Sequence, residues 1–118
     1  MVKDAIPTED YEQIHFVKWF RQNYPERIFH LPNGGRRSIS EGCKFKALGV
    51  SAGVPDLHVP AWSLWIEMKR VKGGRLSPEQ NDWIEYLEGI GHSVIVGYGA
   101  EDAMRKVRDF LKDNLPAP

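Results

Sequence analysis

Two acidic residues and a lysine near the middle of the chain have types and spacing that could support phosphodiester hydrolysis. Asp56 follows Pro55, and Glu67 and Lys69 lie in the next apolar run. Side chains alternate along a strand, so Glu67 and Lys69 would share one face, and a hairpin would bring Asp56 beside Glu67. Two carboxylates and an ammonium group can hold a hard divalent cation and a water next to a phosphodiester. The pattern therefore predicts a nuclease site.

The elements that must position these residues can be read from periodicity and turn signals. Strands are predicted at 54–59 and 64–71, which would form the hairpin. A helix is predicted at 8–23, with Thr8 as its N-cap. Another helix opens at Ser77, where Pro78 takes the first position and Gln80 completes a capping box. The remaining predicted elements are a strand at 27–31, a helix at 40–48, an apolar strand at 92–98 that should be central in the sheet, and a helix at 101–111. The order α-β-α-β-β-α-β-α predicts an α/β fold with a mixed central β-sheet flanked by helices.

The overall composition is that of one domain, residues 1–118. With 118 residues, 42% of them hydrophobic and 27% charged, the chain can build a single core without disulfides. The lone Cys43 has no internal partner, no 18-residue apolar run occurs, and the first residues lack the apolar segment of a signal peptide. We therefore expect a cytoplasmic protein with no membrane partner.

Positive charge is concentrated around the candidate site although the formal net charge is zero. Eight of the sixteen Lys and Arg residues lie between positions 36 and 75, where only three acids occur. Such a face suits a DNA backbone, and the alternative is a set of solvated loops that are basic by chance. The candidate DNA-binding residues are Asn33, Arg36, Arg37, Lys44, Lys46, Arg70, Lys72 and Arg75.

These motifs, in this order, resemble the virus-type replication-repair nuclease (VRR-NUC) domain of the PD-(D/E)XK superfamily. The segments that carry the resemblance are Glu12-Gln13, His30–Gly35, Gly49–Leu57, Ile66–Arg70 and Gly73–Gln80, so it covers nearly the whole chain. The resemblance implies a restriction-endonuclease-like core and DNA hydrolysis that depends on Mg²⁺ or Mn²⁺, with no nucleotide cofactor. Single-domain members are typical of phages and bacteria and are similar to dimeric nucleases that cut four-way (Holliday) junctions. We therefore expect a bacterial or phage-infected host cell as the setting.

Within this resemblance, Asp56 and Glu67 would bind the metal directly, and the backbone carbonyl of Met68 would supply a further oxygen. The structural alternatives are a turn role for Asp56 and a cross-strand salt bridge for Glu67. Lys69 would contact the attacking water and the phosphate, either as a general base or as an electrostatic clamp.

Two further residues have competing interpretations. Glu12 would add a third carboxylate, directly or through a water, if the first helix packs against the hairpin; Glu9 is the competing candidate. Glu12 shares a helix face with Phe16, which places it at the edge of the core or in a site. Gln80 either bonds the backbone of Ser77 in the capping box or points toward the site and orients a water or Lys69.

We thus expect a structure-selective DNA endonuclease that acts as a homodimer on branched DNA, because two symmetric sites supply the two cuts that a junction needs. Trp62 at the hairpin tip is a candidate for the dimer interface, and the alternative is a monomer whose aromatic residues fill one core. His30 is either a general acid, a DNA contact or a structural residue. The alternative functions are a flap nuclease or exonuclease of the same superfamily, and a non-catalytic DNA-binding subunit.

Overall fold

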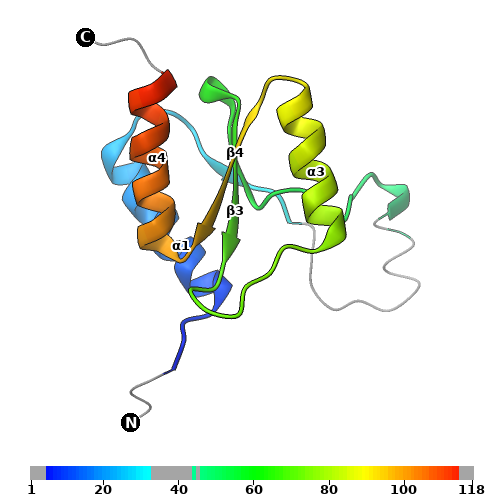
Figure 1. Cartoon of the computed structure of the whole chain (residues 1–118), viewed down its shortest axis with the longest axis horizontal. Coiled ribbons are helices and arrows are strands. Elements are labelled where there is room, and N and C mark those ends of the chain that lie inside the picture. The colour runs from blue at the N-terminus through cyan, green and yellow to red at the C-terminus, as the bar shows by residue number, and fades with distance from the viewer. Residues whose placement is uncertain (1–4, 33–43, 45, 115–118) are drawn as a thin grey trace.

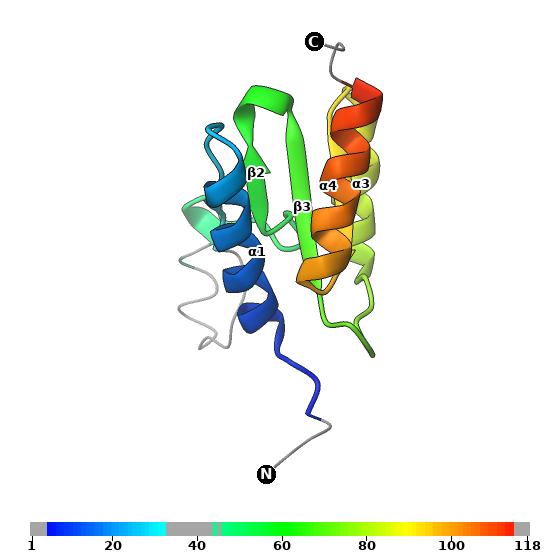
Figure 2. The ribbon, with the colours of Figure 1, turned by 90° about the vertical axis from the view of Figure 1, so that its left-hand side faces the viewer.

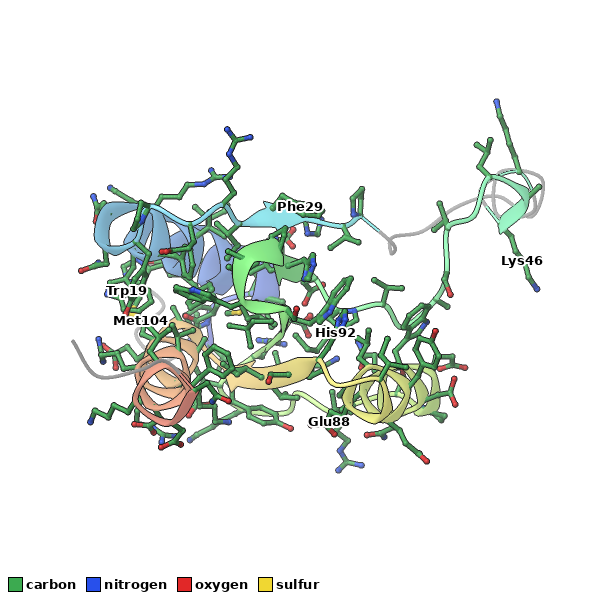
Figure 3. The ribbon with its side chains drawn as sticks, turned by 90° about the horizontal axis from the view of Figure 1, so that it is seen from above. Trp19, Phe29, Lys46, Glu88, His92 and Met104 are labelled. Atoms are coloured by element: carbon green, nitrogen blue, oxygen red, sulfur yellow. The ribbon has the colours of Figure 1, made fainter. Side chains whose placement is uncertain are left out.

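A four-stranded mixed sheet separates two helices from a third (Figure 1). The computed structural model describes residues 5–32, 44 and 46–114. The helices are α1 (Glu9–Asn23), α3 (Pro78–Gly89) and α4 (Ala100–Asn114), and the strands are β1 (Phe29–His30), β2 (Leu57–Val59), β3 (Leu64–Lys69) and β4 (Ser93–Tyr98). Helices α1 and α4 lie side by side on one face of the sheet (Figure 2), and α3 lies on the other face next to β4 (Figure 3). The fold class predicted from the sequence is confirmed.

The sheet has the order β1-β2-β3-β4, with antiparallel pairing from β1 to β3 and parallel pairing between β3 and β4. The hairpin register opposes Leu57 to Ile66, which places Asp56 next to Glu67. The prediction that the strand at 92–98 is central was wrong, since β4 is the last strand of this sheet. It is apolar nonetheless, because α4 packs on one of its faces and α3 on the other.

The strand predicted at 54–59 is shorter than expected, because β2 begins only at Leu57. Pro55 has no N–H to donate to a ladder. The side chain of Asp56, rather than its strand backbone, accepts the bond from the Met68 N–H on β3. An irregular turn therefore delivers Asp56 to the end of the hairpin.

Helix α1 begins as predicted, with the Thr8 Oγ1 accepting a hydrogen bond from the Tyr11 N–H at 3.1 Å. Its buried face carries Glu12, Phe16 and Phe20, as the periodicity predicted. The two phenylalanines are fully buried in the core between α1, α4 and the sheet. Helix α1 is thus fixed on the sheet with its first turn near the ends of β2 and β3.

Trp62 packs within its own chain. It lies in the short 3-10 helix η1 (Pro60–Trp62) that joins β2 to β3. Its ring centroid is 5.6 Å from that of Phe20, 5.5 Å from that of Tyr24 and 6.3 Å from that of Phe110. The ring thus belongs to the edge of the core, which weakens the case for Trp62 as a dimer contact.

The helix predicted at 40–48 falls largely outside the described residues. Within this range, Lys44 and residues 46–47 are described and helical. No helix in the described part of the chain is long and apolar enough to cross a membrane.

Candidate functional site

The side chains of Asp56, Glu67 and Lys69 converge where β2 begins and β3 ends. Strand alternation buries Ile66 and Met68 in the core and sends Glu67 and Lys69 to the opposite face. Both are nonetheless buried, with 2% of Glu67 and 6% of Lys69 exposed. Asp56 Oδ2 accepts a hydrogen bond from the Met68 N–H at 2.7 Å, and the Asp56 carboxylate is also hydrogen-bonded to Glu67. The structure thus brings together the three residues that the sequence singled out first.

Glu67 is held in its protonated form. Burial raises the pKa of this carboxyl to about 9, with further increases from its hydrogen bond to Asp56 and from the Asp56 charge. The Lys69 ammonium opposes the shift, and the charge of Glu9 adds to it. A buried carboxyl group that keeps its proton beside a second carboxylate is typical of a site built for a cation.

Contacts from the β1 side and from β3 both hold Asp56 in place. Its main-chain carbonyl accepts the Leu31 N–H at 2.8 Å and lies 2.9 Å from His30 Nδ1, which donates to it in the tautomer that carries the proton on Nδ1. The side-chain amide of Gln13 lies 3.1 Å from the same imidazole nitrogen. His30 therefore has a positioning contact with Asp56, which the sequence did not specify because it depends on the pairing of β1 with β2.

The two candidate carboxylates of α1 have different surroundings. Glu12 Oε1 accepts a hydrogen bond at 3.1 Å from the N–H of Ala100, the first residue of α4, and Glu12 is buried there. A negative side chain at this position satisfies a free N–H and complements the helix dipole. Glu9, in contrast, is the α1 carboxylate whose charge acts on Glu67. The structure thus directs Glu12 toward α4, whereas Glu9 is exposed and acts on Glu67 through its charge.

Gln80 takes part in the capping box of α3. Its Oε1 accepts the Ser77 N–H at 2.8 Å, and the Ser77 Oγ accepts the Gln80 N–H at 3.1 Å. The capping interpretation is confirmed, whereas the orientation of a water or of Lys69 by Gln80 stays a prediction. Gly53, three positions before Asp56, lies against the same turn of the helix.

The donor set fits a small hard cation. Asp56 and Glu67 supply carboxylate oxygens, the ligand type that Mg²⁺ and Mn²⁺ prefer. Among residues 5–32, 44 and 46–114, no His, Cys, Asp or Glu residues form a group of three or more that could hold a metal ion. Within the part of the chain that the structure describes, Asp56 and Glu67 are therefore candidate ligands as a pair, and their metal binding, like a third ligand from the Met68 carbonyl or from α1, stays a prediction.

Basic residues follow the end of β3 that carries Lys69. Arg70, Lys72 and Arg75 are exposed in the connection that follows this strand, and Arg70 Nη2 donates to the Ile6 carbonyl at 3.2 Å. Lys44 and Lys46 are also exposed, and Lys46 points away from the rest of the protein (Figure 3). The other three candidate DNA contacts, Asn33, Arg36 and Arg37, lie outside the described residues.

Comparison with known proteins assigns the family. A solved structure described as "VRR_NUC domain protein" superposes with a TM-score of 0.76 and 30% sequence identity, over 92% of this chain and 91% of that one. No protein-family model and no curated protein matches the sequence. The resemblance identified from the motifs is thereby confirmed, and the mixed sheet with its flanking helices is consistent with the restriction-endonuclease-like fold. The chain therefore belongs to the VRR-NUC family of nuclease domains.

Proposed function

We propose that this domain is a divalent-metal-dependent endonuclease that hydrolyses DNA phosphodiesters at branched structures, four-way junctions in particular. The observation that supports it most is the hydrogen-bonded Asp56–Glu67 pair, in which Glu67 is buried and Asp56 half-buried, with the buried Lys69 on the Glu67 face of the strand. A buried acid and a buried lysine carry a large desolvation cost, and packing alone does not require charged groups at these two positions. Membership in a nuclease family gives the cluster its chemical interpretation.

Asp56 and Glu67 would hold Mg²⁺ or Mn²⁺, with the Met68 carbonyl as a further oxygen. Once bound, the cation would lower the pKa of a water and stabilise negative charge on the phosphate. Glu67 must lose its proton to become a ligand, so metal binding releases a proton from a site in which the pKa of Glu67 is raised. Asp56 is ready for this role, because bonds from both β1 and β3 hold it in place.

Lys69 would stabilise the developing negative charge of the phosphate. Its ammonium lies on the Glu67 face of β3 in a largely buried position, where an electrostatic interaction is stronger than in water. The exposed Arg70, Lys72 and Arg75 follow it in the chain and would bind flanking phosphates without reading sequence. This arrangement supports selection by DNA shape.

Glu9 would be the α1 carboxylate nearest to the cation. Its charge acts on Glu67, and it is exposed in the first turn of α1. The carboxylate of Glu12 is already used as an acceptor at the start of α4. The role first expected of Glu12 is therefore proposed for Glu9.

We further propose a symmetric homodimer as the active species. One chain carries one Asp56–Glu67–Lys69 cluster and cuts one strand, whereas a four-way junction requires two cuts on symmetry-related strands. A twofold pair of sites supplies both cuts in one encounter.

Cleavage of labelled four-way junction, flap and linear duplex DNA tests this function, with Mg²⁺, Mn²⁺, Ca²⁺ or chelator in parallel reactions. We expect rapid junction cleavage with Mg²⁺ or Mn²⁺ and none with chelator. Glu67→Ala is the matched inactive control. Junction cleavage that is undiminished in excess chelator would contradict the metal-dependent mechanism, and equal rates on all three substrates would contradict structure selectivity.

A further inference from the structure

The backbone at Gly53, in the segment leading to Asp56, packs against the first turn of α3. Its φ of +89° is in the left-handed region, and a Cβ built there would lie 2.4 Å from the Glu79 carbonyl carbon and 2.8 Å from the Gln80 nitrogen. Ordinary van der Waals contacts of a Cβ begin near 3.4 Å. A side chain at this position would therefore have to push two stretches of backbone apart by roughly 1 Å.

The connection from Gly53 to Asp56 is short and stiff. Pro55 directly precedes Asp56, its ring fixes φ, and its side chain is fully buried. A second contact fastens the same segment to α3, because Trp83 Nε1 donates to Ser51 Oγ at 3.1 Å. A displacement of the Gly53 backbone would therefore also displace the Asp56 carboxylate.

The surface that Gly53 meets is itself held rigid. Glu79 and Gln80 lie in the first turn of α3, where both bonds of the capping box are present and Pro78 restricts the backbone. A capped first turn resists the fraying that is usual at helix ends. The backbone of the Ser77-Pro78-Glu79-Gln80 motif is therefore a rigid surface against which the Gly53 segment packs.

We propose that the first turn of α3 positions Asp56 through direct backbone contact with Gly53, so that Gly53 and the capping pair Ser77 and Gln80 are positioning residues. The capping motif then contributes to the site by fixing where Asp56 lies. The expected effect on metal affinity rests on the proposed function. The expected effect on the position of the Asp56 carboxylate does not depend on that function.

The test compares Gly53→Ala with Gly91→Ala in the full chain. Gly91 has nearly the same backbone strain, with a φ of +92°, but a Cβ there would meet no atom within 4 Å. The first readout is amide hydrogen exchange of Met68 in metal-free protein, because the Met68 N–H donates to Asp56 Oδ2. The second readout is the affinity for Mn²⁺ alone, and the third is kcat and KM for junction cleavage.

We expect Gly53→Ala to accelerate Met68 exchange about tenfold or more while Gly91→Ala leaves it within about twofold, since only the former displaces the carboxylate. Mn²⁺ affinity and kcat should fall about 10- to 100-fold in Gly53→Ala, with little change in KM. Equal exchange rates and equal Mn²⁺ affinities in the two variants would overturn the proposal, even if both lose similar stability.

Two further variants keep the test decisive if Gly53→Ala fails to fold. Ser51→Ala removes the Trp83 contact and Gln80→Leu removes one bond of the capping box, without adding bulk at Gly53. Both should accelerate Met68 exchange by a smaller factor, and unchanged exchange in both would refute the positioning role. A wild-type protein that binds no Mn²⁺ would refute the proposed function, while the Met68 readout would still decide this inference.

Discussion

Replacing Glu67 by glutamine should change how the stability of the metal-free protein depends on pH. In the folded protein the pKa of Glu67 is raised to about 9, from an ordinary value of 4.5. Between these two pH values the folded state keeps a proton that the unfolded chain releases. The free energy of unfolding must therefore fall as pH rises across this window. Glutamine has a similar shape and no charge to lose, so this contribution disappears in Glu67→Gln.

The size of the effect follows from proton linkage. One proton bound in the folded state and absent in the unfolded state costs about 1.4 kcal/mol for each pH unit. From pH 5.5 to pH 7.5, wild type should therefore lose about 2.7 kcal/mol more stability than Glu67→Gln. At pH 7.5 without metal the variant should be the more stable protein, because Glu67 must take up a proton for wild type to fold at that pH and glutamine need not.

Urea denaturation in chelator at pH 5.5, 6.5 and 7.5 measures this difference for both proteins. Glu88→Gln is the matched control, because it removes a carboxylate that is exposed on α3 (Figure 3) and should follow wild type. Parallel pH profiles for wild type and Glu67→Gln would show that Glu67 is ionised in the folded protein, and would refute the description of the site as a protonated pair.

Four further outcomes are expected. Asp56→Ala and Glu67→Ala should abolish junction nicking while binding DNA with near wild-type anisotropy, because affinity comes mainly from Lys and Arg contacts; wild-type nicking by either variant would contradict the site assignment. Ca²⁺ should support DNA binding in the same anisotropy assay but little cleavage, since its longer, looser coordination activates water poorly; rapid cleavage in Ca²⁺ alone would argue against this chemistry. Glu12→Gln should lower the free energy of unfolding by about 1 kcal/mol through a weaker bond to the Ala100 N–H. Glu9→Gln should instead weaken Mn²⁺ binding in a titration with little loss of stability. The reverse pattern would show that Glu12, and not Glu9, is the α1 carboxylate of the site. Sedimentation equilibrium at micromolar concentration should give a dimer, and a monomer that still cuts both junction strands in one encounter would exclude the dimeric mechanism.

Much of the fold and the centre of the site could be predicted because their signals are local. The Thr8 cap, the capping box at Ser77 and the alternation along β3 each depend on a few neighbouring residues. The hairpin register then follows from its short connection and brings Asp56 to Glu67. Local chemistry was therefore sufficient to place the two carboxylates and Lys69 together.

The parts that sequence reasoning missed depend on contacts between distant segments. The apolar run of β4 suggested a central strand, but helices on both faces give an edge strand the same composition. Glu12 matched both a site role and a core-facing role, and only the packing of α4 against α1 shows which atom its carboxylate meets. The contact of Gly53 with α3 leaves no periodic pattern at all, because a glycine signals freedom of the backbone but not the neighbour that requires it.

The bond between Glu12 and the Ala100 N–H joins residues separated by 88 positions, and it lies within the core that α1 and α4 share. Contacts of such long range form late in folding, because a large loop must close before any interaction compensates for the lost chain entropy. The Met68–Asp56 and His30–Asp56 bonds span shorter loops, of 12 and 26 positions.

A growing chain would thus contain Asp56, Glu67 and Lys69 well before the helix that closes the core has been synthesised. Until α4 docks, the buried acceptor on α1 has no donor from Ala100, and the sheet lacks the cover that fixes β4. A chain that ends before α4 would therefore lack both the Ala100 donor to Glu12 and the helix that covers this face of the sheet.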